Sequence, residues 1–251
     1  MPPLIRRAAW PLLAFAIALL LWQLGVLALN VRTPIGHQFG PWPAAQALWQ
    51  LLLDGSLWPH LRVSLQRLFA GLALALLLGV PLGLLTGLSK GFAQATTPLF
   101  QFLRMVSPLS WMPLAVIALG VGDAPVIFLL AFAAVWPILL NTAAGVAALD
   151  PNWLLLGRSL AATRRETVLR IVLPGITAPV LTGVRLALGL LWIVIVPAEM
   201  LGVSAGLGYF ILDTRDRLAY PELMATIVFI GFVGWALDAG ARALHQRWLH
   251  A

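Results

Sequence analysis

The stretch DPNWLLLGRSLAATRRETVLRIVLP (residues 150–174) is the longest polar interruption in a chain that is otherwise almost continuously apolar. Asp150 is a good helix N-cap, and Pro151 follows at the first helical position, where its missing N–H costs nothing. Thr163 and Glu166 have the spacing of a capping box. We therefore predict two short helices joined by a turn at Ala161–Ala162. They indicate a basic docking surface for a soluble partner, and an ordinary helical loop is the alternative.

Composition indicates an integral membrane protein. Hydrophobic residues make up 61% of the 251 residues and charged residues 10%, whereas a soluble domain carries about 25% charged residues. The 16 basic residues outnumber the 9 acidic ones, but they are spread around the apolar runs. They are therefore interpreted as determinants of membrane topology, not as a nucleic-acid interface. The chain has no cysteine, which excludes disulfides and thiolate metal sites.

Six apolar runs are long enough to cross a membrane, because about 20 residues span one hydrocarbon core. We expect these spans at residues 10–29, 68–88, 97–119, 125–146, 174–201 and 223–244. Pro98, Pro108 and Pro113 should break the third span. The fold class is thus an all-α polytopic membrane protein. Residues 1–60 are predicted to form an N-terminal anchor helix and an extracytoplasmic segment, and residues 61–251 a transmembrane domain.

The arginine distribution predicts that both termini are cytoplasmic, since cytoplasmic loops carry an excess of basic residues. The inner side would hold Arg6, Arg7, Lys90, Arg158, Arg164, Arg165, Arg170, Arg242 and Arg247. The outer side would hold Arg32, Arg62, Arg67, Arg215 and Arg217. Residues 44–53 should form a short interfacial helix, and residues 202–221 a polar outer loop with a tight turn at Gly206–Gly208.

No catalytic set of residues is recognisable. The one lysine, Lys90, follows Ser89, so the chain lacks the Gly-Lys-Ser/Thr sequence of a phosphate-binding loop. Its four histidines lack the spacing of metal ligands; they are His37, His60, His245 and His250. We expect no catalytic residue, no metal and no cofactor bound by this chain. We therefore predict that this polytopic protein moves a solute with energy supplied by another protein.

The end of the opening stretch resembles the cytoplasmic coupling loop of ABC importer permeases. That pattern is E-A-A, three residues, Gly, nine residues and I-x-L-P. Ile171, Leu173 and Pro174 match its end. The front half departs from it, because Leu155, Leu156 and Gly157 occupy the E-A-A places and Ala161 occupies the Gly place. Residues 57–89, 136–146, 183–201 and 206–216 resemble the nitrate, sulfonate, taurine and bicarbonate branch of these permeases.

This resemblance implies a type I ABC importer permease fold in a bacterial inner membrane, with the coupling loop between spans four and five. It implies a subunit that forms the path for a small oxyanion and pairs with a second permease subunit, expected to be another copy. Two cytoplasmic ATPases would carry the ATP-Mg, and an extracytoplasmic binding protein would deliver the substrate. Arg158, Arg164 or Arg165 would supply the polar contact that the missing Glu cannot make.

Five charged residues could each have a functional role or a merely structural one. Glu199 is a pathway or gating candidate because an intramembrane acid is costly and by default functional; it could instead lie at the headgroup boundary. Arg185 could line the pathway, but we favour snorkelling to the inner surface. Arg104 could face the cytoplasmic surface or the pathway. Asp213 and Asp216 could dock the binding protein or belong to a solvated connector.

Two other classes of protein are alternatives to an ABC permease. A secondary transporter driven by an ion gradient would need intramembrane carboxylates for ion coupling, and Glu199 is the one candidate. A membrane enzyme would need polar catalytic groups clustered at one interface, and the sequence shows no such cluster.

Overall fold

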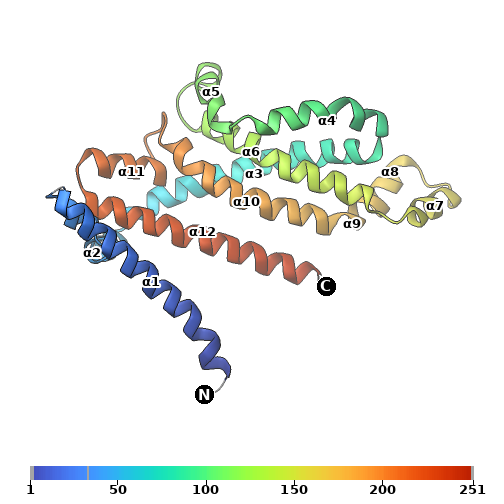
Figure 1. The fold of residues 1–251 in the computed structure, drawn as a ribbon. Helices are drawn as coiled ribbons and strands as arrows, with labels where there is room; N and C mark the ends of the chain where they lie inside the picture. The colour runs from blue at the N-terminus through green and yellow to red at the C-terminus, as the bar shows by residue number, and fades with distance from the viewer. Residues whose placement is uncertain (1–2, 33, 250–251) are drawn as a thin grey trace. The chain divides into compact units, whose positions relative to one another are not determined.

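A computed structural model describes residues 3–32 and 34–249, and every regular element in these two ranges is a helix (Figure 1). His250 lies outside the described residues. The chain divides into two compact units. The first comprises residues 1–60 and 210–231, and the second comprises residues 61–209 and 232–251. Each unit is described by itself.

The first unit contains α1 (Pro3–Arg32), η1 (Gly36–Phe39) and α2 (Pro41–Leu53). The indole N–H of Trp22 donates to the carbonyl of Phe39 at 2.9 Å, which ties α1 to η1. The Phe39 ring also lies 4.8 Å from that of Tyr220. The interfacial helix expected at residues 44–53 is α2, which begins three residues earlier because a proline fits its first turn.

We had expected the polar segment 202–221 to be a loop, but part of it is helical. It contains a ten-residue helix, α11 (Leu207–Asp216), which is followed by α12 (Tyr220–Leu249). Leu207, Phe210 and Thr214 recur at helical spacing, and all three are buried. That periodicity predicts a helix, but it was concealed by Asp213 and by the three charged residues after Thr214.

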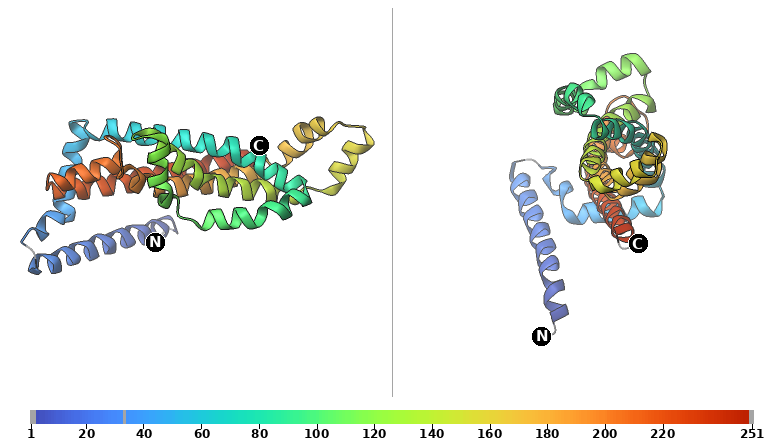
Figure 2. Two further views of the ribbon diagram at one scale, coloured as in Figure 1. Left: turned by 90° about the horizontal axis from the view of Figure 1, so that it is seen from above. Right: turned by 90° about the vertical axis from the view of Figure 1, so that its right-hand side faces the viewer.

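The second unit holds most of the apolar core. Its main elements are α3 (Leu57–Leu88), α4 (Lys90–Met105), η2 (Pro108–Trp111), α5 (Met112–Leu119), α6 (Asp123–Ala147) and α10 (Thr177–Glu199). Figures 1 and 2 show α6 and α10 running side by side, and their buried residues form one cluster with those of α3. Leu129, Ile138 and Leu191 are among its fully buried members.

A stripe of small residues brings α3 close to α6. Gly71, Ala75, Gly79, Gly83 and Gly87 recur every fourth residue of α3. A Cβ atom on any of the four glycines would come within 3.0 Å of an α6 side chain. Membrane helices have no hydrophobic effect to drive them together, so close packing at small residues is a main source of their association.

Five helices are long and apolar enough to cross a membrane, and one bent pair can supply a sixth span. The bent pair is α4 with the segment Pro108–Leu119, and the bend measures 89°. Pro98 lies inside α4 without breaking it, whereas the break falls just before Pro108, where a proline disfavours helical geometry for the preceding residue. The expectation of about six spans is confirmed, and the bent pair lies where the broken third span was expected.

The stretch 150–174 forms two short helical segments. The first is α7 (Pro151–Ser159); the second runs through α8 (Arg164–Thr167), the π-helix η3 (Val168–Val172) and α9 (Leu173–Gly175). They extend beyond the end of α6 (Figure 2). The fifth span was expected to begin at residue 174, but Pro174 still belongs to the second segment, because a proline fits the first turn of a helix and here it occupies that of α9. The break falls at Ile176, so the fifth span begins at Thr177.

Candidate functional site

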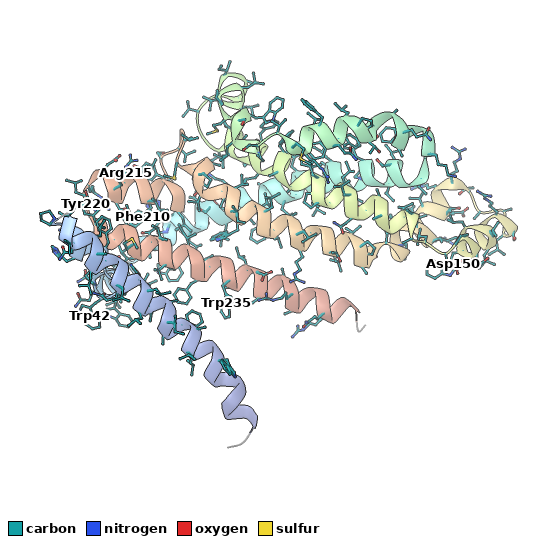
Figure 3. All side chains as sticks on the ribbon, viewed as in Figure 1. Trp42, Asp150, Phe210, Arg215, Tyr220 and Trp235 are labelled. Carbon is teal, nitrogen blue, oxygen red and sulfur yellow. The ribbon has the colours of Figure 1, made fainter. Side chains whose placement is uncertain are left out.

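The helix pair begins with a complete N-cap. Asp150 lies at the junction between α6 and α7 (Figure 3). Its carboxylate accepts a hydrogen bond from the backbone N–H of Asn152 at 2.8 Å, and Pro151 follows at the start of the helix. Such a cap stabilises a helix by about 1 kcal/mol, which keeps the nine-residue α7 from fraying.

The turn between the two helices has the hydrogen bonds of a Schellman motif. The N–H of Ala162 donates to the carbonyl of Gly157 at 2.9 Å, and the N–H of Ala161 donates to that of Arg158 at 3.0 Å. Ala161 has a φ of 52°, the left-handed conformation that this motif requires and that glycine adopts without strain. Ala161 occupies the Gly place of the coupling-loop pattern, so the motif explains physically why that pattern has glycine.

The second helix starts with the predicted capping box. The hydroxyl of Thr163 accepts from the backbone N–H of Glu166 at 3.3 Å, and the Glu166 carboxylate accepts from the backbone N–H of Thr163 at 2.9 Å. That backbone N–H and, next, the Thr163 hydroxyl lower the pKa of the Glu166 carboxyl below its ordinary value. The carboxylate is therefore ionised, and the box complete, at neutral pH.

The base of the helix pair is anchored in the second unit. Val172 and Ile176 are fully buried and pack against Val146 from the end of α6. Gly157 is buried under Ile171, whose Cδ1 would lie 2.9 Å from a Cβ on the glycine. Two residues assigned to the coupling loop from sequence, Gly157 and Ile171, therefore lie against each other.

The rest of the helix pair presents an exposed surface of apolar and basic side chains. Leu155, Leu156 and Leu160 are more than half exposed, and Arg158, Arg164 and Arg165 are exposed beside them. A cavity of about 390 Å³ lies at its base, lined by Trp153, Leu156, Arg170, Ile171, Pro174 and Gly175. Leucines exposed together in a segment with four arginines are typical of a protein–protein contact.

A second group of charged residues, two of them buried, lies at the opposite end of α6. We call it the Glu199 cluster; it comprises Ser64, Arg67, Asp123, Glu199 and the backbone of residues 205–208. Glu199, the last residue of α10, is fully buried and accepts hydrogen bonds from Ser64 Oγ, from Arg67 Nη1 at 2.8 Å and from the N–H of Gly208 at 3.1 Å.

Arg67 is the centre of this cluster. Its guanidinium, with 5% of its side chain exposed, donates to Glu199 and to the carbonyl of Ala205 at 2.6 Å. It also donates twice to one carboxylate oxygen of Asp123, at 2.8 and 2.6 Å. Because Asp123 begins α6, the cluster joins α3, α6 and α10 with the segment that leads into α11.

Glycine is required where the backbone passes over Glu199. Gly206 has a φ of +117°, which side chains other than glycine rarely adopt, and a Cβ there would overlap the Glu199 carboxylate. A Cβ on Gly208 would overlap the carbonyl of Val196. The tight turn expected at Gly206–Gly208 is in fact the start of α11, and there the backbone N–H of Gly208 reaches the buried carboxylate.

Sequence reasoning identified Glu199 but missed its partners. Arg67 had been counted among the topology arginines, and Ser64 and Asp123 had not been considered. Two signals could have found them: a buried intramembrane acid demands a cation, and Ser64 and Arg67 are three residues apart, on one face of a helix.

The other sequence candidates lie apart from this cluster. Arg185, in α10, lies 3.7 Å from Asp238 of α12 and lines a cavity of about 340 Å³. Arg104 is exposed in the last turn of α4. Asp213 pairs with Arg217 at 2.9 Å, and Asp216 pairs with Arg215 at 2.8 Å. The two aspartates therefore form ion pairs within α11 and with Arg217, the residue that follows it; Figure 3 labels Arg215.

Comparison with known proteins shows the family. Residues 79–249 match the family described as binding-protein-dependent transport system inner membrane component. The chain belongs to this family. It is therefore a multi-pass membrane protein and a component of a transport system. The sequence-based resemblance to ABC importer permeases is confirmed.

Three curated relatives align with this chain over most of its length and most of their own. The nitrate import permease protein of Leptolyngbya laminosa is 34% identical, over 94% of this chain and 85% of the relative. The taurine transport system permease protein of Escherichia coli strain K12 is 32% identical, over 98% and 90%. The bicarbonate transport system permease protein of Synechococcus elongatus is 36% identical, over 78% and 71%.

A solved structure of an ABC transporter has the same fold. A chain of the methionine ABC transporter MetNI, in an inward-facing conformation, matches with a TM-score of 0.64. The match covers 77% of this chain and 98% of that chain at 12% sequence identity. The type I importer permease fold, all-α and with about six spans, is therefore confirmed for this family member.

Proposed function

We propose that this chain is the permease subunit of an ATP-driven importer for a small oxyanion, such as nitrate, bicarbonate or an aliphatic sulfonate like taurine. One observation carries the proposal: relatives named for these three solutes match over 71–90% of their own length. Each of these solutes carries an anionic oxyacid group. The chain would form the translocation path, paired with a second copy of itself.

The exposed surface of the helix pair supports the proposal that an ATPase partner docks there. A soluble partner with a groove could take up the exposed leucines, and acidic residues at its rim could pair with Arg158, Arg164 and Arg165. The rigid base at Val172 and Ile176 would transmit movement of the helix pair to α6 and α10. We therefore assign ATPase coupling to residues 150–174, with two ATPase subunits that carry the ATP-Mg.

The remaining assignments follow from the same proposal. The helix pair would face the cytoplasm of a bacterial cell, as would both termini, so that the Glu199 cluster lies toward the outer side. A binding protein would deliver the oxyanion there and dock near Asp213 and Asp216. Residues 61–251 would form the transport domain, and residues 1–60 the anchor helix and the extracytoplasmic segment.

The geometry of Glu199 argues against a secondary transporter. An ion-coupling carboxylate must exchange its proton or ion with water during each cycle. Glu199 is fully buried, and its two oxygens accept from Ser64, Arg67 and Gly208. A carboxylate bound in this way is suited to hold helices together.

The test is transport by the reconstituted system. The chain, its ATPase and its binding protein should be placed in proteoliposomes, and uptake of nitrate, bicarbonate and taurine measured with and without ATP. We expect ATP-dependent uptake of at least one of them, which ends when the ATPase is omitted. Uptake that continues without ATPase and follows an ion gradient would disprove the proposal.

A second measurement tests the coupling assignment. A bulky side chain at the tip of the helix pair should separate ATP hydrolysis from uptake, so Ala161→Trp is expected to abolish transport in an inserted protein. Gly91→Trp, at a position where an added Cβ meets no atom within 4 Å, is the matched control. Normal uptake by Ala161→Trp, together with no crosslink between residues 157–165 and the ATPase, would place coupling elsewhere.

A further inference from the structure

Arg185 is a charged residue that forms no hydrogen bond within the part of the chain that the structure describes. It lies eight residues into α10, about 12 Å along the helix from its start at 1.5 Å per residue. Its Nε is 3.7 Å from the nearest Asp238 oxygen, beyond hydrogen-bonding distance. Within the described ranges, no hydrogen bond is formed by this guanidinium, which carries five N–H donors.

Asp238 is chiefly neutralised by another arginine. Arg242, one turn further along α12, places Nη1 2.5 Å from Asp238 Oδ2. The shorter separation gives Arg242 the stronger Coulomb attraction, since the energy falls with distance. The three side chains together carry one net positive charge, and Arg185 is the cation left without a close partner.

The free guanidinium lines a cavity. The cavity measures about 340 Å³ and is lined by Thr182, Arg185, Leu186, Gly189, Leu190 and Asp238. A small oxyanion occupies only a fraction of that volume, because one water molecule takes about 30 Å³ in the liquid. The lining of the cavity includes Leu186 and Leu190, so the surroundings are less polar than bulk water and an anion inside would be attracted more strongly than in water.

We propose that Arg185 binds the transported oxyanion in this cavity, at an intermediate position on the translocation path. The planar guanidinium fork matches two oxygens of nitrate, bicarbonate or a sulfonate group. Asp238 keeps the binding weak, because its carboxylate repels the anion that Arg185 attracts. A transport site must bind its solute well enough to admit it and weakly enough to release it. The proposal rests on the oxyanion substrate class assigned above.

Two other arginines do not offer such a site. Arg67 already donates four hydrogen bonds within the Glu199 cluster. Arg104 is exposed at the end of α4, and no cavity described for this chain includes it. Arg185 thus differs from both in that it lines a cavity and forms no hydrogen bond within the described residues.

The experiment uses anion protection of a single cysteine in the complete importer. The chain has no cysteine, so Gly189→Cys would be its one thiol, provided that the partners are made cysteine-free. A Cβ at Gly189 meets no atom within 4 Å, and the new thiol would lie on the cavity wall. Gly91→Cys, also in open space, is the control thiol.

We expect millimolar nitrate, bicarbonate or taurine, whichever the importer transports, to slow labelling of Cys at position 189 but not at position 91. Arg185→Gln should remove this protection and lower ATP-dependent uptake about tenfold to hundredfold, the effect of one charge-assisted hydrogen bond. Arg185→Lys should restore part of both. Arg62→Gln, at an exposed arginine of α3, is the matched control and should change neither.

Three results would overturn the inference. The first is labelling at position 189 that the transported anion does not slow. The second is protection that persists in Arg185→Gln. The third is labelling at position 189 that slows when the proteoliposomes are made of phosphatidylglycerol instead of phosphatidylcholine but does not slow with the soluble anion. That result would identify a lipid headgroup site. An importer that moves no oxyanion in any variant would refute the proposed function instead, so the two failures are distinguishable.

Discussion

Arg67 and Arg185 are both arginines in helices that span the membrane, but their surroundings differ in every respect that matters. Arg67 is buried and donates hydrogen bonds to two carboxylates and a backbone carbonyl. Arg185 is 40% exposed, its nearest carboxylate is 3.7 Å away, and it faces a cavity. A guanidinium whose N–H groups are engaged in hydrogen bonds within the protein stabilises the structure. One whose N–H groups are not engaged can bind a ligand. The difference predicts opposite responses to mutation.

The largest effect is expected from breaking the Arg67–Glu199 pair. Arg67→Met or Glu199→Leu leaves an uncompensated buried charge, which should cost about 3–5 kcal/mol of stability. The double variant should recover much of this loss, because it leaves neither charge buried alone. The measurement is unfolding of the solubilised protein, followed through the fluorescence of its 11 tryptophans.

Asp123→Asn is the control for that experiment. The Asp123 side chain is 66% exposed, and exposed ion pairs contribute about 0–1 kcal/mol. If Glu199→Leu is no more destabilising than Asp123→Asn, the Glu199 cluster does not hold the helices together and the comparison fails.

A pair of glycine substitutions sharpens the same contrast. Gly206→Ala places a Cβ at a φ of +117° and onto the Glu199 carboxylate, so it should cost at least about 2 kcal/mol. Gly189→Ala, in the cavity beside Arg185, meets no atom within 4 Å. It should stabilise α10 by about 0.5–1 kcal/mol, because alanine is the better helix former. Equal costs for the two would show that the cavity is packed as tightly as the cluster.

The turn at Ala161 is an intermediate case, in which the backbone is strained but exposed. Ala161→Gly keeps the left-handed conformation and relieves about 1 kcal/mol of strain. Amide hydrogen exchange of residues 157–167 should slow about fivefold if local opening controls it. Ala162→Gly, where no positive φ occurs, is the control and should not slow exchange. Faster exchange in Ala161→Gly would mean that the strain is absent in solution.

The predictability of these features depended on how far apart the interacting residues lie in the sequence. The spans, the N-cap at Asp150 and the capping box at Thr163 and Glu166 are local patterns, and the sequence predicted them all. The continuation of the helix through Pro174 was missed, because the π-helix that leads into it leaves no mark in hydropathy.

The charge clusters were predictable only in part. Glu199 stood out as an acid in an apolar run, but Arg67 lies 132 residues before it, and no local spacing connects them. Arg185 looked like a snorkelling side chain, because its relation to Asp238 and the cavity exists only after α10 and α12 have packed. Sequence reasoning therefore found single unusual charges. It could not distinguish Arg67, which is hydrogen-bonded within the protein, from Arg185, which is not hydrogen-bonded within the described residues.

Arg185→Gln is expected to have the smallest effect on stability, although its effect on transport should be large. Arg185→Gln removes a charge that is half exposed and forms no hydrogen bond within the described residues, so the free energy of unfolding should change by no more than about 0.5 kcal/mol. Arg67→Gln, the matched substitution in the Glu199 cluster, should destabilise the protein several times more, because it leaves Glu199 buried without its cation.

The two variants should be unfolded side by side in the same detergent, and their uptake compared in the same proteoliposomes. A transport-deficient Arg185→Gln that is as stable as the wild type would separate solute binding from folding. If Arg185→Gln instead unfolds as readily as Arg67→Gln, its weak pair with Asp238 is structural. Both arginines would then serve the fold, and the solute would have to be bound elsewhere on the path.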